Sequence, residues 1–359
     1  MLVVLPEAGF GLYFHWPFCQ AKCPYCDFNS HVVASVDQSR WAAAFEQEID
    51  RVAELTGDRV LNSVFFGGGT PSLMDVSTVQ RILNRVQRSW RLANDIEVTL
   101  EANPTSIEAE RFAGYHSAGV NRVSVGVQAL NDPDLKALGR LHSADEALTA
   151  VDIARSTFER VSFDLIYARQ SQSVTQWQSE LTSALSLDPD HLSLYQLTIE
   201  DGTAFGDRFR RGGLKGLPDE NLSADLWDVT QEACNDAGLP AYEVSNHAKS
   251  GQEGRHNLIY WRSGDWAGIG PGAHGRLTLS GQRIATETPL LPEKWLEQVN
   301  ANGTANRDAE IISNSDQAAE YLMMSLRLAS GSNLNRVQSL CPDRICTDGL
   351  QTLIDNEFV

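Results

Sequence analysis

The sequence is short of cysteine, of long apolar runs and of basic charge, and each shortage excludes a class of protein. Six cysteines in 359 residues are too few and too unevenly placed for a disulfide framework. No apolar run approaches the roughly 18 residues that a membrane helix needs. The N-terminal stretch MLVVLPEAGFGLYF is apolar, but it has neither a basic leader nor a small-residue cleavage site. We therefore expect a cytosolic protein without a membrane span.

The charge balance excludes further partners. There are 29 Lys and Arg residues against 47 Asp and Glu residues, which gives a formal net charge of −18. This excess repels nucleic-acid phosphates and anionic membranes, so we expect no nucleic acid as a partner. A local basic pocket for a carboxylate-bearing ligand is still compatible with it. At 42% hydrophobic and 21% charged residues the composition is that of a globular protein, with one large domain or two of ordinary size.

The first half of the chain alternates short β-rich runs with helical patterns. Six runs dense in β-branched and aromatic residues predict buried parallel strands, at 12–15, 63–66, 96–101, 122–128, 161–167 and 191–197. Between them, apolar residues recur at helical spacing, as at Trp41, Phe45, Ile49 and Val52. Similar patterns lie at 76–86, 107–118, 144–154 and 174–185. Six βα units in series predict either a doubly wound sheet or a barrel.

Polar residues at several strand ends favour the barrel. Glu101, Gln128 and Asp164 each stand at or near the end of a predicted strand. In a barrel, chemistry collects at the C-terminal strand ends, whereas a doubly wound sheet concentrates it at one switch point. We divide the chain into 1–205, a Gly-rich basic linker at 206–221, and a smaller, mainly α region at 222–359. The chain stops in a helical pattern, and we expect some C-terminal structure to be missing.

The stretch FHWPFCQAKCPYCDF places Cys19, Cys23 and Cys26 within eight positions. A zinc ion or a four-iron cluster usually takes four ligands, so three thiols leave one position without a cysteine. Zinc with His15 or His31 as the fourth ligand is one interpretation, and unligated thiols are another. Structural zinc sites usually pair two C-x-x-C units or add a spaced histidine pair, which this stretch does not. The spacing therefore favours a [4Fe–4S] cluster with one iron left open.

A second motif, FFGGGTPS, follows the second predicted strand. Three consecutive glycines remove side chains where a strand meets its loop, so the backbone can approach a ligand closely. Taken together, CQAKCPYCDF and GGGTP resemble the radical S-adenosylmethionine superfamily, and within it the haem-chaperone branch, a relative of oxygen-independent coproporphyrinogen III dehydrogenase. The resemblance runs from Tyr13 to about Gly275 and includes EANP, RVSVGVQ, LKALGRLH, FDLIY and HNLIYW. It implies a partial (β/α)6 barrel with a smaller, mainly α C-terminal domain.

The resemblance also implies a binding site. The open iron would be chelated by the amino and carboxylate groups of S-adenosylmethionine, with Cys19, Cys23 and Cys26 as the cluster ligands. The implied contacts of this cofactor are Tyr13 beside the nucleoside, Tyr25 over the adenine, Gly68, Gly69 and Thr70 at the methionine amine, Glu101 at the ribose, Gln128 and Asp164 at later strand rims, and Arg140 at a carboxylate. A strand-end ion pair for Glu101 and a solvated surface position for Arg140 are the alternatives. The loop IYARQSQS (Ile166–Ser173) departs from the family's Gly-Leu-Pro-Gly-type turn.

Two features favour the chaperone branch. Phe28 stands where the dehydrogenase branch typically has another cysteine, and only Met1–Gly11 precede the first predicted strand. In HNLIYW, His256 could ligate haem iron or orient a porphyrin, with Tyr260 and Trp261 packed on the macrocycle. A core histidine is the alternative. The implied function is delivery of haem to haem-requiring acceptor proteins, with an electron donor as a further partner. The alternatives are an anaerobic coproporphyrinogen III oxidase and a zinc-stabilised binding module.

Overall fold

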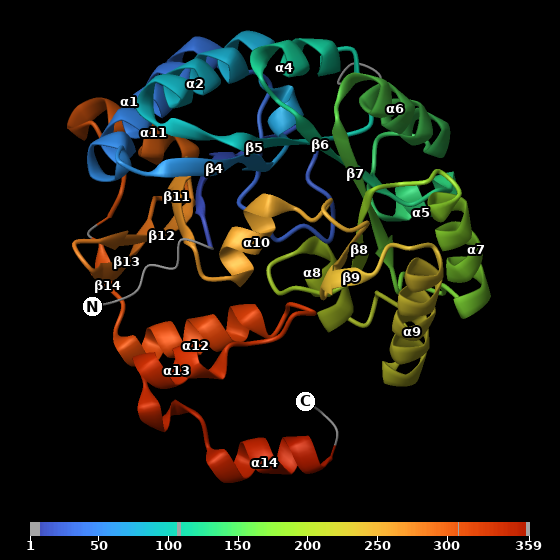
Figure 1. Cartoon of the computed structure of the whole chain (residues 1–359). Helices are drawn as coiled ribbons and strands as arrows, with labels where there is room; N and C mark the ends of the chain where they lie inside the picture. Colours follow the sequence, from blue (N-terminus) through green and yellow to red (C-terminus); the bar gives the residue numbers. More distant parts are fainter. Residues whose placement is uncertain (1–7, 106–108, 308, 357–359) are drawn as a thin grey trace.

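The computed structural model describes residues 8–105, 109–307 and 309–356, and its centre is a sheet of six adjacent parallel strands (Figure 1). They are β1 (Phe10–Trp16), β4 (Val60–Gly68), β5 (Arg91–Ala102), β6 (Arg122–Gln128), β7 (Arg160–Tyr167) and β8 (His191–Gln196). Each strand pairs in parallel with the next in that order. The six strands expected from the sequence and the partial (β/α)6 barrel are therefore confirmed.

Helices return the chain between these strands and cover the outer face of the sheet (Figure 1). They are α1 (Gln38–Thr56), α2 (Val76–Ser89), α4 (Phe112–Ala118), α5 (Asp132–Ala137), α6 (Ala144–Thr157) and α7 (Val174–Leu185). Local signals start several of them. The Asp37 carboxylate accepts from a backbone N–H of α1, and Ser143 and Ser173 each form a capping box. The predicted helix at 107–118 begins outside the described residues, and its remainder forms α4.

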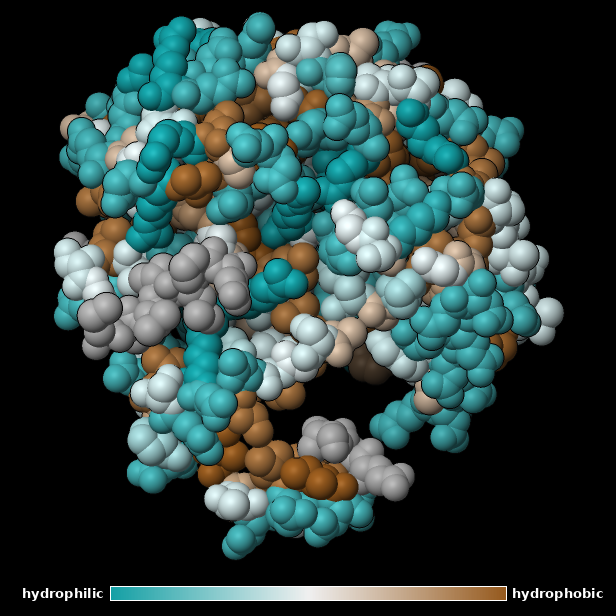
Figure 2. Space-filling view, in the orientation of Figure 1, coloured by the Kyte–Doolittle hydropathy of each residue, from teal (hydrophilic) through white to brown (hydrophobic). Residues whose placement is uncertain are grey.

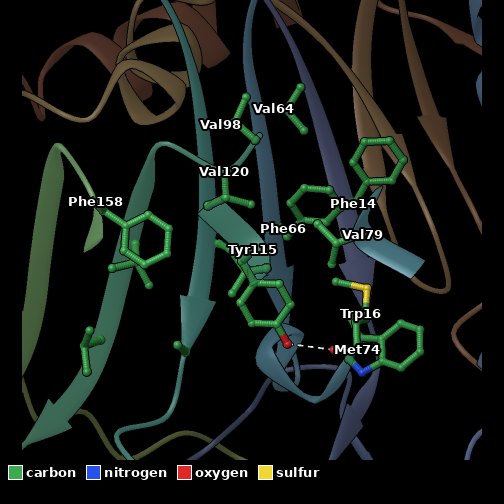
Figure 3. Packing of buried hydrophobic residues seen from close by; sticks show 14 of the residues in the cluster. Phe14, Trp16, Val64, Phe66, Met74, Val79, Val98, Tyr115, Val120 and Phe158 are labelled. Carbon is green, nitrogen blue, oxygen red and sulfur yellow. Dashed lines mark hydrogen bonds between the residues drawn. The ribbon is translucent and has the colours of Figure 1, made fainter. Parts of the chain in front are cut away.

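The core lies between the sheet and this helical layer, and it supports the turn after β4. Phe14 of β1 stacks on Phe66 of β4 with ring centroids 5.1 Å apart (Figure 3). The hydroxyl of buried Tyr115, in α4, lies 2.8 Å from the carbonyl oxygen of Ser72 and 2.7 Å from that of Met74. A buried aromatic with its polar atom satisfied packs without a desolvation cost. The backbone that follows β4 is thus fixed by hydrogen bonds from helix α4.

The C-terminal region extends the same sheet at both edges. At one edge, β11 (Asp265–Ile269) pairs in parallel with β1 and is followed by antiparallel β12 (His274–Leu279), β13 (Gln282–Glu287) and β14 (Glu310–Ile311). At the other edge, antiparallel β10 (Asn246–Ala248) and β9 (Ala241–Glu243) follow β8. Because one sheet runs across the predicted boundary, the division into 1–205 and 222–359 remains a proposal about sequence organisation.

Helices make up most of the rest of this region. They are α9 (Glu220–Asp236), α10 (Arg255–Trp261), α11 (Pro292–Asn302), α12 (Asn314–Ser325), α13 (Leu334–Leu340) and α14 (Thr347–Asp355). The predicted linker at 206–221 overlaps a further helix, α8 (Ala204–Arg210). Figure 2 shows hydrophobic side chains at the lower end of the molecule, over α12 and α14, and the exposed ones there include Met323, Leu326, Leu353 and Ile354. Among the described helices, none combines the length and the apolarity needed to span a bilayer.

Candidate metal centre and cofactor site

The three-cysteine loop follows the first barrel strand, at the carboxyl edge of the sheet. A short strand, β2 (Phe18–Cys19), pairs with β3 (His31–Val32) and closes the loop at its base. Cys19, Cys23 and Cys26 are half-buried along it. Carboxyl ends of parallel strands are where barrel proteins build their sites. All three thiols therefore lie on a loop at the edge of the sheet where a binding site is expected.

The glycine turn after β4 lies against the base of this loop. The N–H of Gly69 donates to the Trp16 carbonyl at 2.7 Å, and the N–H of Thr70 donates to the Phe18 carbonyl at 2.8 Å. A Cβ on Gly69 would lie 2.7 Å from the backbone oxygen of Phe18. Gly68 adopts a φ of +109°, which L side chains rarely adopt. The glycines thus allow two backbones to meet where any side chain would separate them.

Gly68→Ala is expected to destabilise the protein. An added Cβ would lie 2.6 Å from a ring carbon of His15 and would also sit in the left-handed region. We expect a loss of more than about 1 kcal/mol of unfolding free energy, measured by thermal unfolding of the metal-free protein. Gly212→Ala is the matched control, because its φ is +70° and no atom lies within 4 Å of its added Cβ. Equal losses in the two variants would contradict the steric part of the argument.

The thiols are held among polar partners. The Thr70 hydroxyl donates to the sulfur of Cys19 at 3.4 Å, and the Arg140 guanidinium donates to the sulfur of Cys23 at 3.4 Å. Burial raises the pKa of Cys19, and the neighbouring Cys26 and Cys23 raise it further. Burial also raises the pKa of Cys26. Thiols that resist ionisation on their own become thiolates beside a cationic metal group, so this set of donors fits a shared metal cluster.

The two histidines proposed for a zinc site face elsewhere. The Nδ1 of His15 lies 3.0 Å from the Tyr13 hydroxyl, and its Nε2 lies 2.8 Å from the Asn29 carbonyl oxygen. The Nε2 of His31 lies 3.1 Å from the side-chain oxygen of Asn29. In the described ranges, no three Cys, His, Asp or Glu side chains are grouped as ligands of one metal ion. A cluster suits separated thiols better, because its cysteines bind different irons.

Two carboxyl groups face the barrel interior. Burial and the charge of Asp164 raise the pKa of Glu101 to about 8, although the N–H of Gly68 opposes this rise. Burial raises the pKa of Asp164 to about 6, and the hydroxyl of Ser124 donates to its Oδ1 at 3.3 Å. The strand-end ion pair is not formed among the described residues, where Arg122 and Arg160 pair with Glu97 and not with Glu101. A carboxyl group in this setting can accept from, or donate to, neutral hydroxyls.

The raised pKa of Glu101 gives a pH prediction. The folded protein holds this proton more tightly than the unfolded chain does, so its contribution to stability is full below about pH 4.5 and is lost as the pH rises through about 8. Glu101→Gln should therefore reduce the fall in Tm between about pH 5 and about pH 9. The exposed-site control is Asp225→Asn, which should leave the fall unchanged. Parallel Tm curves for Glu101→Gln and the unmodified protein would contradict the prediction.

Arg140 connects the cysteine loop to the strand ends. Its Nη2 donates to the side-chain oxygen of Asn103 at 2.6 Å and to the Gly126 carbonyl at 3.0 Å. Its Nε is buried and has no hydrogen-bond partner among the described residues. A buried guanidinium nitrogen without an acceptor fits a carboxylate ligand at this position. The solvated surface alternative does not fit, because the Arg140 guanidinium donates to three groups within the fold and its Nε is buried.

The remaining predicted contacts surround the same interior. Burial raises the pKa of Tyr13, and the nearby charge of Glu101 raises it further. Burial raises the pKa of Tyr25, which also interacts with Arg140 and Cys23. Gln128 adopts a φ of +71° at the end of β6, where the register with β7 shifts. Such backbone strain costs about 1–3 kcal/mol and clusters at functional sites. Gln128 lies near Arg140, because a Cβ on Gly126 would be 3.0 Å from the Gln128 amide nitrogen and 3.4 Å from an Arg140 nitrogen. The role of these residues as cofactor contacts remains a proposal.

His256 is buried, and both nitrogens of its ring have hydrogen-bond partners. It is 1% exposed in α10. Its Nδ1 lies 2.7 Å from the Ser63 hydroxyl and its Nε2 lies 2.6 Å from the Tyr260 hydroxyl. Burial lowers its pKa to about 3, so the ring is neutral. With both nitrogens engaged, neither is free for an iron atom. This is the setting of a core histidine, the alternative stated above, and a haem contact of His256 remains a proposal.

Sequence reasoning missed two asparagines of this site. Asn103 accepts from Arg140 and donates to the Thr70 hydroxyl at 3.2 Å, so it links the two groups that contact thiols. A signal was present, because Asn103 lies two residues after Glu101 and strand residues two apart share a face. Asn29 donates to the carbonyls of Pro271 and Leu290 at 3.0 and 2.9 Å. No local pattern could reveal contacts across more than 240 positions of sequence.

A parallel half-barrel with a three-thiol loop, a glycine turn beneath it and an inward-facing arginine defines a radical S-adenosylmethionine protein. The family model described as "Radical SAM superfamily" matches residues 13–170. The heme chaperone HemW of Escherichia coli is 37% identical over 362 residues, covering 99% of this chain and 91% of that protein. The chain belongs to the HemW family within this superfamily.

Two further comparisons agree. The mouse protein named radical S-adenosyl methionine domain-containing protein 1, mitochondrial, is 41% identical over 325 residues, covering 89% of this chain and 73% of that protein. Among solved structures, coproporphyrinogen III oxidase (HemN) from Escherichia coli has a TM-score of 0.78 at 22% identity, covering 94% of this chain and 80% of that chain. At this identity the second likeness shows the fold alone. Membership of the superfamily implies a [4Fe–4S] cluster and S-adenosylmethionine, which together supply one-electron cleavage of the sulfonium when bound.

Proposed function

We propose that this protein binds haem and delivers it to haem-requiring acceptor proteins. The observation that carries the proposal is its similarity, over nearly its whole length, to proteins named heme chaperones. The exposed Phe28 supports it, because this position is a cysteine in the porphyrinogen-oxidising branch that the sequence resembles less. Haem, the acceptor proteins and an electron donor are the proposed partners. A cytosolic location stays a prediction, since several similar proteins, the mouse one among them, are named as mitochondrial.

The site residues take the roles that the family resemblance implies. Cys19, Cys23 and Cys26 would hold the cluster. Around S-adenosylmethionine at the open iron, the proposed contacts are Tyr13, Tyr25, Gly68, Gly69, Thr70, Glu101, Gln128, Arg140 and Asp164. The buried Nε of Arg140 and the carboxyl group of Glu101 supply the matching chemistry, one for a carboxylate and the other for hydroxyls. His256 enters this proposal as the residue that orients Tyr260, and not as the haem ligand.

The test is anaerobic reconstitution with iron and sulfide, followed by haem titration with and without S-adenosylmethionine and by transfer to an apo-haemoprotein. We expect bound iron and sulfide, a saturable haem spectrum and transfer. Replacing His256 by asparagine should leave the haem spectrum of folded protein unchanged. Conversion of coproporphyrinogen III to protoporphyrinogen would replace the proposal by the oxidase alternative. Stoichiometric zinc without iron or sulfide would replace it by the zinc-stabilised module.

A further inference from the structure

Helix α8, which exposes several basic side chains, lies directly beside the cysteine loop. The N–H of Phe205, in α8, donates to the Pro24 carbonyl at 2.8 Å, and Pro24 lies between Cys23 and Tyr25. The Phe205 ring contacts the Tyr25 ring with centroids 6.4 Å apart. The hydrogen bond and the ring contact both place α8 against the loop, as Figure 1 also shows. Any protein that binds α8 from outside therefore lies close to the thiols.

The outer side of α8 and the turn after it carry a local excess of positive charge. We define the α8 basic face as Arg208, Phe209, Arg210, Arg211 and Lys215, all of which are exposed. Within 206–217 there are four basic residues and one acidic residue, in a chain whose formal net charge is −18. The one acid, Asp207, pairs with Arg210. The face therefore keeps unpaired cations where the rest of the chain is acidic.

Four acids flank this face in the sequence: Glu200, Asp201, Asp219 and Glu220. Asp219 caps α9, since its carboxylate accepts from the N–H of Leu222 at 2.9 Å. Glu200 and Asp201 precede α8, before its buried N-terminal turn. Lys22, exposed on the cysteine loop itself, adds a further cation on the side of the thiols. Asp27 is exposed on the same loop, so the proposed face is limited to α8 and the turn after it.

The face also has an apolar centre and a packed connection inward. Phe209 is 55% exposed among the cations. The guanidinium of Arg208 lies over the Phe205 ring, 6.0 Å from its centroid, and this ring in turn contacts Tyr25. Only two aromatic rings therefore separate the face from the segment that holds Cys23 and Cys26. The turn after α8 is fixed as well, because the N–H of Ser171 donates to the Gly216 carbonyl at 2.6 Å.

We propose that the α8 basic face is the docking surface for an acidic one-electron carrier protein, with flavin or iron–sulfur as its redox group. The inference rests on the proposed function, because it takes the cluster to be held by the cysteine loop. On docking, the reduced carrier is oxidised by one electron and the oxidised cluster is reduced by one, with no bond formed or broken. Small, polar interfaces that form by charge attraction are typical of such transient redox encounters. An exposed phenylalanine ringed by cations suits a carrier with an acidic rim around its redox group.

The test measures binding and cluster reduction separately. The probes are a reduced acidic flavodoxin and a reduced acidic [2Fe–2S] ferredoxin. The variant is Arg208→Glu with Arg211→Glu, and the matched control is Arg88→Glu with Arg344→Glu, exposed residues of α2 and of the turn Pro342–Arg344. Because Arg208 packs on Phe205, a second variant, Arg211→Glu with Lys215→Glu, repeats the test without that contact. Affinity is first measured with cluster-free protein, so the result does not depend on activity.

We expect the face variants to lower the association rate of the carriers by about 10- to 100-fold at low salt, and the control pair to lower it far less. The difference should shrink at about 0.5 M salt, where charges are screened. Cluster reduction by a carrier should slow in parallel, whereas photoreduction by deazaflavin should not. Equal effects of face and control variants would overturn the proposal. So would loss of haem binding in the face variants, or attachment of the face to anionic lipid vesicles with no binding of either carrier. Failure of the carriers with haem and cluster retained leaves the chaperone function intact, so the two proposals fail separately.

Discussion

Replacement of any one of Cys19, Cys23 and Cys26 by serine is expected to remove most of the bound iron and sulfide. Each thiol is half-buried on a loop closed by β2 and β3, and the other cysteines lie in different elements, Cys234 in α9 and Cys341 and Cys346 in the C-terminal region. Loss of even an outer contact to a metal ligand lowers metal affinity by about 10- to 100-fold, so loss of the ligand itself should exceed tenfold. Iron and sulfide per chain, measured after anaerobic reconstitution, report the change.

Cys341→Ser serves as the control, because Cys341 lies in the C-terminal region, far along the chain from the loop, and is also half-buried. This variant should keep the iron and sulfide of the unmodified protein. Circular dichroism of all variants shows whether the fold is retained. Full cluster content in a single-cysteine variant of the loop would contradict the assignment of three ligands.

Arg140→Ala is expected to weaken binding of S-adenosylmethionine by about 10- to 100-fold, since a charge-assisted hydrogen bond contributes about 1.5–3 kcal/mol. The buried Nε has no acceptor within the described chain, and the two other nitrogens already bond Asn103, Gly126 and Cys23. The change in the electron paramagnetic resonance spectrum of the reduced cluster on titration with S-adenosylmethionine gives the affinity.

Arg140→Lys should give an intermediate loss, because lysine keeps the charge but not the planar fork. Iron content must be measured beside the affinity, since Arg140 also donates to the sulfur of Cys23. Arg88→Ala, on exposed α2, is the control for removal of a cation. An unchanged affinity in Arg140→Ala with full iron content would show that no carboxylate binds there.

The barrel could be predicted because its strands are buried on both faces. A strand such as β1, flanked by β4 and β11, is apolar along almost its whole length, and such runs are visible in sequence. Strands β11 to β14 were missed. They are short, at two to six residues each, although Arg276, Leu277, Thr278 and Leu279 in β12 do alternate polar and apolar residues. Helix α8 was missed as well, because seven residues are too few to show a helical period.

The site was predictable to the extent that its residues stand in local motifs. Cys19, Gly68 and Glu101 are each marked by their neighbours along the chain. The setting of His256 could not be predicted in the same way, because its two partners are Ser63, 193 residues away, and Tyr260. A motif can show that a histidine matches a family pattern, but it cannot show whether the ring nitrogens are free. Only the three-dimensional contacts decide that.

The parallel pairing of β11 with β1 bears on how this protein can be dissected. A fragment ending near residue 170, where the superfamily match ends, would lack β11 and so would leave one side of β1 with bare amide and carbonyl groups. Bare strand edges recruit other chains. The same truncation would cut away Pro271 and Leu290, to which Asn29 is tied. We therefore expect that a fragment keeping both the β11 pairing and the Asn29 contacts must reach at least to residue 290.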